Sequence, residues 1–235
     1  MQAADFDLSM NIEIEKFLVD YIQTLEKLLI VADSKVTDDR KREILKAAWD
    51  AIAKNSIWYL GNYRLNLSTG QDKIVPVPIY ELAFSSRLII EAASDLEYYY
   101  FADNKELDLF FKESEDLSTM TDEKQIKHIC KINYRDYYMP KVTTMKRLRK
   151  CFGKSGIGYY NTLCRNNHLN YLGYKLSLNN LFTYDIRTHG LIFILAALDT
   201  LREVLEKANL INTGADLDSF IKKSDYYVKK LKEQK

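Results

Sequence analysis

The sequence predicts an all-helical protein, a multi-helix bundle of roughly eight or nine helices joined by short connections. Three observations point to this class. Apolar residues recur at intervals of three and four along most of the chain, which is the spacing of one face of an α-helix. Only 8 glycines and 3 prolines occur in 235 residues, whereas a β-sandwich or barrel needs turn residues at every strand end. The composition, 47% hydrophobic and 29% charged, is that of an ordinary globular protein.

The first two expected helices cover residues 11–32 and 37–64. In the first, apolar residues stand three or four apart and form one face of an amphipathic helix. The second is expected to begin at the Thr-Asp-Asp sequence of residues 37–39, because a hydroxyl caps a helix and acids favour its first turn. Residues 65–78 contain Ser-Thr-Gly and two prolines, and therefore predict a loop.

The later part of the chain predicts one buried helix and several amphipathic ones. Residues 79–101 are apolar almost all round, so this helix is expected to be central. Gly153 is expected to end a basic amphipathic helix. After the central helix, the expected helices cover residues 104–111, 123–132, 142–152, 159–169, 183–208 and 217–231.

No internal repeat and no linker-like stretch divides the sequence. A single helical domain over residues 1–235 is therefore predicted. Within it, the expected subdivision is an N-terminal helical hairpin at residues 11–64, packed on a bundle at residues 78–231.

The charges are strongly segregated, although the formal net charge is only +1. Residues 137–184 contain no Asp or Glu, and they carry eight Lys or Arg and seven tyrosines. Residues 91–123 carry eleven acids, offset only by Lys105 and Lys112. The tyrosines of the basic segment are Tyr137, Tyr138, Tyr159, Tyr160, Tyr171, Tyr174 and Tyr184.

This segregation has two interpretations. In the functional one, Lys146, Arg147, Arg149 and Lys150 bind the phosphates of a polyanion, and nearby tyrosines stack on unpaired bases. In the structural one, the acidic helices pack beside the basic ones, within one molecule or across a homodimer, and the tyrosines are edges of the core.

Two polar groups stand out from this pattern. Arg87 and Glu91 are one helical turn apart in an otherwise apolar stretch, where an ion pair is costly unless further hydrogen bonds satisfy it. A third polar partner is therefore expected, and the candidate is the helix that carries Arg165 and His168. These two residues stand at positions i and i+3 and would share one face of that helix.

The same residues carry a family resemblance. Arg87 and Glu91 are followed much later in the sequence by Tyr160, Leu163, Cys164, His168 and Asn170. This pattern resembles that of an uncharacterised group of bacterial helical proteins, which pairs an Arg-x-x-x-Glu helix with a Tyr-x-x-Leu-Ser/Cys-x-x-x-His helix. The group is similar in turn to the HEPN helical bundles (higher eukaryotes and prokaryotes nucleotide-binding). Many of these are dimeric RNases or RNA-binding parts of toxin and phage-defence systems. The resemblance covers residues 78–205 and rests on Arg87, Glu91, Tyr160, Leu163, Cys164, His168 and Asn170.

The resemblance implies a polar core cluster of Arg87, Glu91, Tyr160 and Asn170. HEPN nucleases also carry an Arg followed by a His after four to six intervening residues, and no Arg–His pair in this sequence has that spacing. This departure from the nuclease pattern favours binding over cleavage.

Motifs for other chemistry are missing from the sequence. The three cysteines form no C-x-x-C, and Asp185 with His189 gives only two ligands, so neither a metal site nor a cofactor is predicted. The N-terminus has no signal-peptide pattern, and the longest apolar run, residues 191–198, is too short to span a bilayer. A cytoplasmic location without membrane contact is expected.

The predicted function is binding of RNA or another polyanion through the basic Tyr-rich segment, in a defence-associated role. Two alternatives stay open. One is a protein-interaction or homodimerisation module without catalysis. The other is a metal-independent, HEPN-like RNase, with His168 as general base and Arg165 stabilising phosphate charge.

Overall fold

The protein is described by a computed structural model that covers residues 8–68, 79–131, 142–167, 181–212 and 214–233. Within these ranges all regular structure is helical, with eight helices and no strand, so the all-α class is confirmed. The helices are α1 (Leu8–Asp33), α2 (Asp39–Ser68), α3 (Ile79–Tyr99), α4 (Asn104–Ser118), α5 (Asp122–Lys131), α7 (Thr144–Asn167), α9 (Leu181–Lys207) and α10 (Ala215–Glu233).

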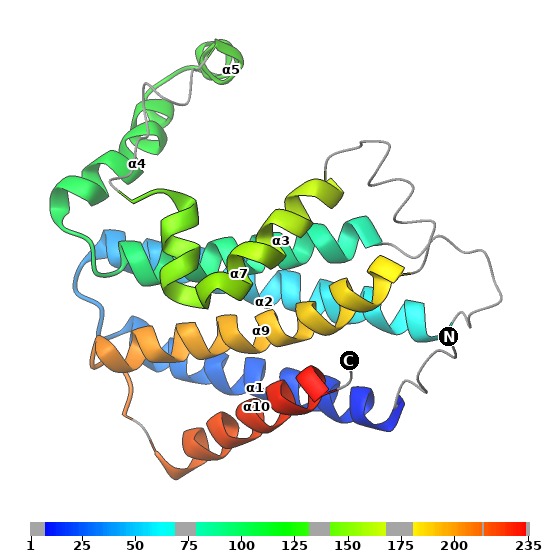
Figure 1. The fold of residues 1–235 in the computed structure, drawn as a ribbon. Coiled ribbons are helices and arrows are strands. Elements are labelled where there is room, and N and C mark those ends of the chain that lie inside the picture. Colours follow the sequence, from blue (N-terminus) through cyan, green and yellow to red (C-terminus); the bar gives the residue numbers. More distant parts are fainter. Residues whose placement is uncertain (1–7, 69–78, 132–141, 168–180, 213, 234–235) are drawn as a thin grey trace.

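Helices α3 and α9 form the centre of the bundle. Helix α3 packs against α2, α7 and α9, which agrees with its apolar sequence, and α9 also packs against α1, α2, α7 and α10. Figure 1 shows α1 and α10 on one side of α9, and α3 and α7 on the other. Their buried apolar side chains form one continuous cluster that includes Leu18, Ile52, Ile90, Leu163 and Leu198.

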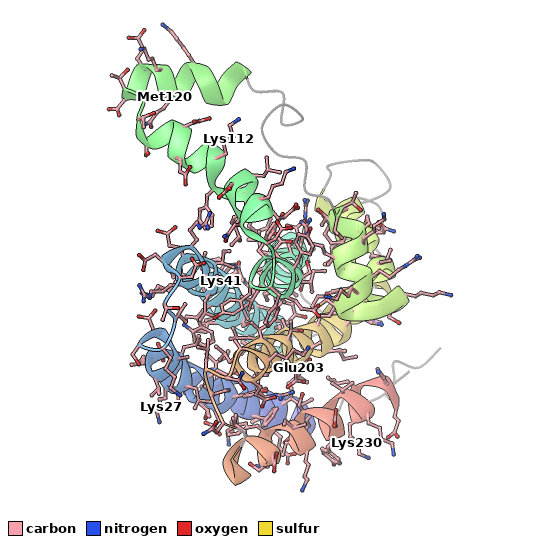
Figure 2. All side chains as sticks on the ribbon, turned by 90° about the vertical axis from the view of Figure 1, so that its left-hand side faces the viewer. Lys27, Lys41, Lys112, Met120, Glu203 and Lys230 are labelled. Carbon is pink, nitrogen blue, oxygen red and sulfur yellow. The ribbon has the colours of Figure 1, made fainter. Side chains whose placement is uncertain are left out.

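Helices α4 and α5, called the acidic arm below, extend away from this body (Figure 1). Figure 2 shows Lys112 and Met120 on the arm, apart from the other helices. The base of the arm is held by Tyr99, whose ring centroid lies 4.2 Å from that of Phe110. It is also held by a hydrogen bond of 3.0 Å from the Tyr98 hydroxyl to Glu106.

One close approach between helices depends on a glycine. Gly190 of α9 lies directly against the fully buried Tyr59 of α2. A Cβ atom at position 190 would lie 2.1 Å from the Tyr59 hydroxyl oxygen and 2.4 Å from its Cζ atom. The absence of a side chain here lets the ring of Tyr59 fill the space between α2 and α9.

The helix ends have identifiable caps. The Asp38 carboxylate accepts the Arg40 and Lys41 backbone amides at 3.0 and 3.3 Å, so the cap of α2 is Asp38, one residue later than a Thr37 cap. Helix α9 ends at Lys207, and Asn209 just beyond it has a φ of 55°. The Leu210 amide then bonds back to the Leu205 carbonyl at 2.9 Å, which is a Schellman motif.

The prediction that Gly153 ends a helix is wrong, because the helix resumes immediately after it. Gly153 adopts φ 66° and ψ −161° inside α7, and this conformation kinks the helix. Two other boundaries also differ. Helix α4 extends to Ser118 rather than residue 111, and α2 runs to Ser68, into the predicted loop.

Candidate polyanion-binding site

Polar side chains follow the contact between α3 and α7, and we call this set the α3–α7 seam: Arg87, Glu91 and Asp95 of α3, with Arg147 and Tyr160 of α7. The three residues of α3 stand at i, i+4 and i+8 and therefore share one face of the helix. The seam contains two separate ion pairs, one on each side of the Gly153 kink in α7.

The first pair brings together three residues of the predicted polar cluster. Arg87 Nε donates to Glu91 Oε1 at 3.1 Å, and the Tyr160 hydroxyl donates to the same oxygen at 2.6 Å. The guanidinium carbon lies 5.7 Å from the centroid of the Tyr160 ring. Tyr160 is thus a third polar partner from α7, the helix that also carries Arg165. The fourth predicted member, Asn170, lies outside the described residues.

The protonation states of this cluster are fixed near neutral pH. Burial alone would lower the pKa of Arg87, but the hydrogen bond and charge of Glu91 outweigh it, and the pKa is raised. The pKa of Tyr160 is also raised, first by burial and then by its hydrogen bonds to Glu91 and Cys164. Arg87 therefore stays a cation, and Tyr160 stays a hydrogen-bond donor.

The second pair corrects the assignment of Arg147 as an anion-binding residue. Its side chain is 4% exposed, and its Nε donates to Asp95 Oδ1 at 2.8 Å. Its terminal nitrogens donate to the Val142 carbonyl at 2.6 Å and to the Thr144 hydroxyl at 3.3 Å. A guanidinium that is buried and paired in this way anchors α7 on α3 and cannot reach a phosphate.

The contact with Arg147 offsets only part of the cost of burying the charged carboxylate of Asp95. Burial raises its pKa, and the charge and hydrogen bond of Arg147 lower it by a smaller amount. The carboxylate and guanidinium are thus interdependent, since each would be a poorly solvated charge without the other.

Three other predicted anion-binding residues are exposed, and we call Lys146, Arg149 and Lys150 the cationic face. They stand at i, i+3 and i+4 before the kink, and α7 contains no acid between residues 144 and 167. Lys150 Nζ lies 3.6 Å from Glu97 Oε1, yet its side chain remains 68% exposed. Figure 2 shows nitrogen-tipped side chains of the yellow-green α7 pointing away from the bundle.

Acids of the acidic segment, residues 91–123, therefore pair with cations of the basic segment, residues 137–184, within one molecule. The pairs Asp95–Arg147 and Glu97–Lys150 join α3 to α7. This is the packing expected from the structural interpretation. It accounts for Arg147 completely, but it leaves the cationic face open to solvent.

The tyrosines with described side chains do not support base stacking. Tyr159 is 7% exposed, and its ring stacks on Phe193 with centroids 4.6 Å apart and on His189 at 5.8 Å. Tyr160 is bound to Glu91. Tyr159 belongs to the interior of the bundle, and Tyr160 is partly buried at its edge. Tyr137, Tyr138, Tyr171 and Tyr174 lie outside the described residues.

The proposed catalytic pair, Arg165 and His168, falls outside the side chains that the structure describes. Arg165 lies in the last turn of α7, and its side chain is not among those described; His168 lies outside the described residues. The RNase alternative stays a prediction. The described residues contain no group of three or more His, Cys, Asp or Glu side chains that could hold a metal ion.

A buried polar network on the other side of α9 was missed. The Tyr21 hydroxyl donates to Asp199 Oδ1 at 2.8 Å, and the Ser224 hydroxyl donates to Asp199 Oδ2 at 2.9 Å. These bonds tie α1 and α10 to α9. The only sequence signal was a single acid, Asp199, directly after the apolar run of α9. Its partners are distant in sequence and could not be inferred from that signal.

Cys151 is partly buried where α7 packs on α9. Its sulfur lies 3.4 Å from the Thr200 hydroxyl, and burial raises its pKa to about 12. The thiol stays protonated at neutral pH and is a weak nucleophile, which fits a structural thiol.

Comparisons of the chain with protein-family models, curated proteins and solved structures found no match. The similarity to HEPN bundles thus stays a prediction. Across the described ranges, none of the helices combines the length and apolarity that crossing a bilayer requires.

Proposed function

We propose that the protein binds RNA, and that the cationic face of α7 contacts the phosphates. The observation that carries this proposal is the exposure of Lys146, Arg149 and Lys150 on one face of a helix without acids. Side chains three and four residues apart on a helix are neighbours, so the three charges form a compact cluster. Such a cluster attracts a polyanion by releasing its condensed counterions.

The burial of Arg147 limits the proposed binding surface to the other three cations. Arg147 pins the first part of α7 to Asp95, and it leaves its neighbours Lys146 and Arg149 facing solvent. The binding surface is then smaller than the sequence suggested. With three cations, the slope of log Kobs against log salt should be about −2 for a single strand, at about −0.7 per neutralised phosphate.

The test compares two charge variants of the full chain. The first carries Lys146→Glu, Arg149→Glu and Lys150→Gln on the cationic face. The second is a matched control with Lys16→Glu, Lys27→Glu and Lys223→Gln, which changes the net charge equally at exposed positions of α1 and α10. Lys150 is changed to Gln rather than Glu because Glu97 lies beside it.

Binding of a single-stranded RNA oligonucleotide is followed by fluorescence anisotropy over a series of salt concentrations. We expect the cationic-face variant to lose most of its affinity and its salt dependence, while the control variant binds like the native protein. Equal affinity in the cationic-face variant, or an equal loss in the control, would show that this face is not the binding site. Far-ultraviolet circular dichroism checks that both variants are folded.

Homodimerisation is a second candidate, favoured by the acidic arm. The arm extends from the body and carries exposed acids that include Asp108, Glu115, Asp122 and Glu123. In a dimer these acids would face the cationic face of a second copy, and salt would weaken that contact. Light scattering at low and high salt measures the mass directly, and a monomer at both salt concentrations would exclude this candidate.

A further inference from the structure

The cluster of Arg87, Glu91 and Tyr160 lies on the far side of the α7 kink from the cationic face. Glu91 engages the guanidinium at Nε alone, at 3.1 Å. Among the described residues, neither terminal nitrogen of Arg87 has a hydrogen-bond partner, and the side chain is 33% exposed. Within the described part of the chain, the two Nη groups are therefore unbound.

The guanidinium is also held in one orientation. Glu91 fixes the Nε edge, and the Tyr160 hydroxyl fixes Glu91 by donating to the same carboxylate oxygen at 2.6 Å. The ring of Tyr160 flanks the guanidinium, with 5.7 Å between the ring centroid and Cζ. Contacts of this kind reduce the rotamer freedom that an arginine loses on binding. The guanidinium is therefore preorganised for a ligand.

Unlike the carboxylate of a simple i, i+4 surface pair, that of Glu91 also accepts a hydrogen bond from a second helix. An exposed i, i+4 pair contributes only about 0.3–0.5 kcal/mol, and its strongest geometry is bidentate, with two parallel N–H···O bonds. Here the carboxylate takes one bond from Arg87 and one from another helix. The pair thus positions the guanidinium through Nε, and among the described residues the Nη1–Nη2 edge carries no hydrogen bond.

We propose that Arg87 binds a phosphate group through Nη1 and Nη2, with Glu91 and Tyr160 as positioning residues. The planar fork of a guanidinium matches two oxygens of a phosphate, which makes phosphate a preferred ligand of oriented arginines. Glu91 neutralises Arg87 at rest, so the cation can be half-buried without a ligand. The phosphate belongs either to an RNA backbone or to a small phosphorylated molecule.

Nuclear magnetic resonance can test this with an internal control. Both Arg87 and Arg147 have their Nε–H bonded to a carboxylate, at 3.1 and 2.8 Å, so both Nε–H signals should be protected from exchange. In a titration with inorganic phosphate against chloride at equal ionic strength, we expect the Arg87 signal to shift and the buried Arg147 signal to stay. The absence of a specific Arg87 shift, together with no shift on adding RNA, would overturn the proposal.

Two variants complete the test. Arg87→Lys keeps the charge but removes the fork, and it should weaken phosphate binding roughly tenfold, as expected when a charge-assisted hydrogen bond is lost. Phosphate affinity in this variant is measured by ³¹P line broadening, and unchanged affinity would again overturn the proposal. Tyr160→Phe keeps the ring but frees Glu91, and it should weaken binding less while the Arg87 Nε–H signal broadens.

The source of the phosphate follows from a second titration, with single-stranded RNA. If RNA also shifts the Arg87 signal, and the cationic-face variant loses only this RNA effect, Arg87 extends the RNA site. If only inorganic phosphate acts, the ligand is a small phosphorylated molecule. Because inorganic phosphate is tested separately, failure of RNA binding and failure of the Arg87 site can be told apart.

Discussion

Replacing Gly190 by alanine tests whether the bundle depends on the close contact between α2 and α9. The added Cβ would lie 2.1, 2.4 and 2.6 Å from three atoms of the Tyr59 side chain. Distances this short are far inside van der Waals contact, so the ring or the helix must move. Tyr59 is 0% exposed and therefore has no solvent to swing into.

The magnitude follows from two opposing effects. Overpacking a well-filled core costs about 1–3 kcal/mol, and the three contacts with a buried ring place this site near the upper end. Alanine in place of glycine in a helix returns about 1 kcal/mol through its better helix propensity. The expected net loss is about 2 kcal/mol, which lowers Tm by about 4–8 °C for a chain of this size.

Thermal unfolding followed by circular dichroism measures the loss, with Gly61→Ala as the matched control. Gly61 also lies inside a helix, α2, but a Cβ there would meet nothing within 4 Å. The control should gain up to about 1 kcal/mol from helix propensity. A Gly190→Ala protein as stable as the native one would refute the packing argument.

A double-mutant cycle identifies the partner. Tyr59→Leu shortens the side chain and costs stability by itself, because it leaves a cavity in the core. In that background Gly190→Ala should become neutral or favourable, since the atoms it would strike are gone. If the two losses simply add, the strain at position 190 arises elsewhere.

Two further predictions concern the backbone and a buried carboxyl. Gly153→Ala should cost about 1–3 kcal/mol, because φ 66° with ψ −161° is a glycine conformation; Gly158→Ala, at an open site of the same helix, should raise Tm instead. Asp199 has a pKa raised above 3.8, chiefly by burial, so its contribution to stability is fully present below pH 3.8 and is lost as the pH rises through the raised value. Urea unfolding at several pH values should therefore show Asp199→Asn gaining on the native protein as the pH rises, and parallel curves would contradict this sign.

Helical periodicity was enough to predict the all-α class and the positions of most of the described helices. The apolar positions of α1, α3 and α9 repeat every three to four residues, and this pattern depends only on which face meets the core. Gly153 shows where local reasoning fails. A glycine can end a helix or kink it, and the outcome depends on whether the chain beyond it can pack on the same neighbour, which here is α3.

The candidate site was predictable only where the signal was local. Arg87 and Glu91 could be paired from the sequence because they stand one turn apart in an apolar helix. The partner of Arg147 is Asp95, 52 residues earlier, and nothing local separates Arg147 from its exposed neighbours. From the sequence alone, phosphate binding is predicted equally for Lys146, Arg147 and Arg149. Only the packing of α7 on α3 shows that Arg147 is buried and the other two are exposed.

The burial of Arg147 and the exposure of Lys146, Arg149 and Lys150 have a physical cause. Successive residues of a helix are about 100° apart, so a run of cations must place some charges inward when the helix packs on a core. Arginine tolerates the inward position better than lysine, since its planar fork can be satisfied by several acceptors at once. Arg147 uses a carboxylate, a carbonyl and a hydroxyl in this way. Arg147 thus sets the orientation of the exposed cations beside it. If the cationic face binds RNA as proposed, a change at Arg147 should weaken that binding only by releasing α7 from α3.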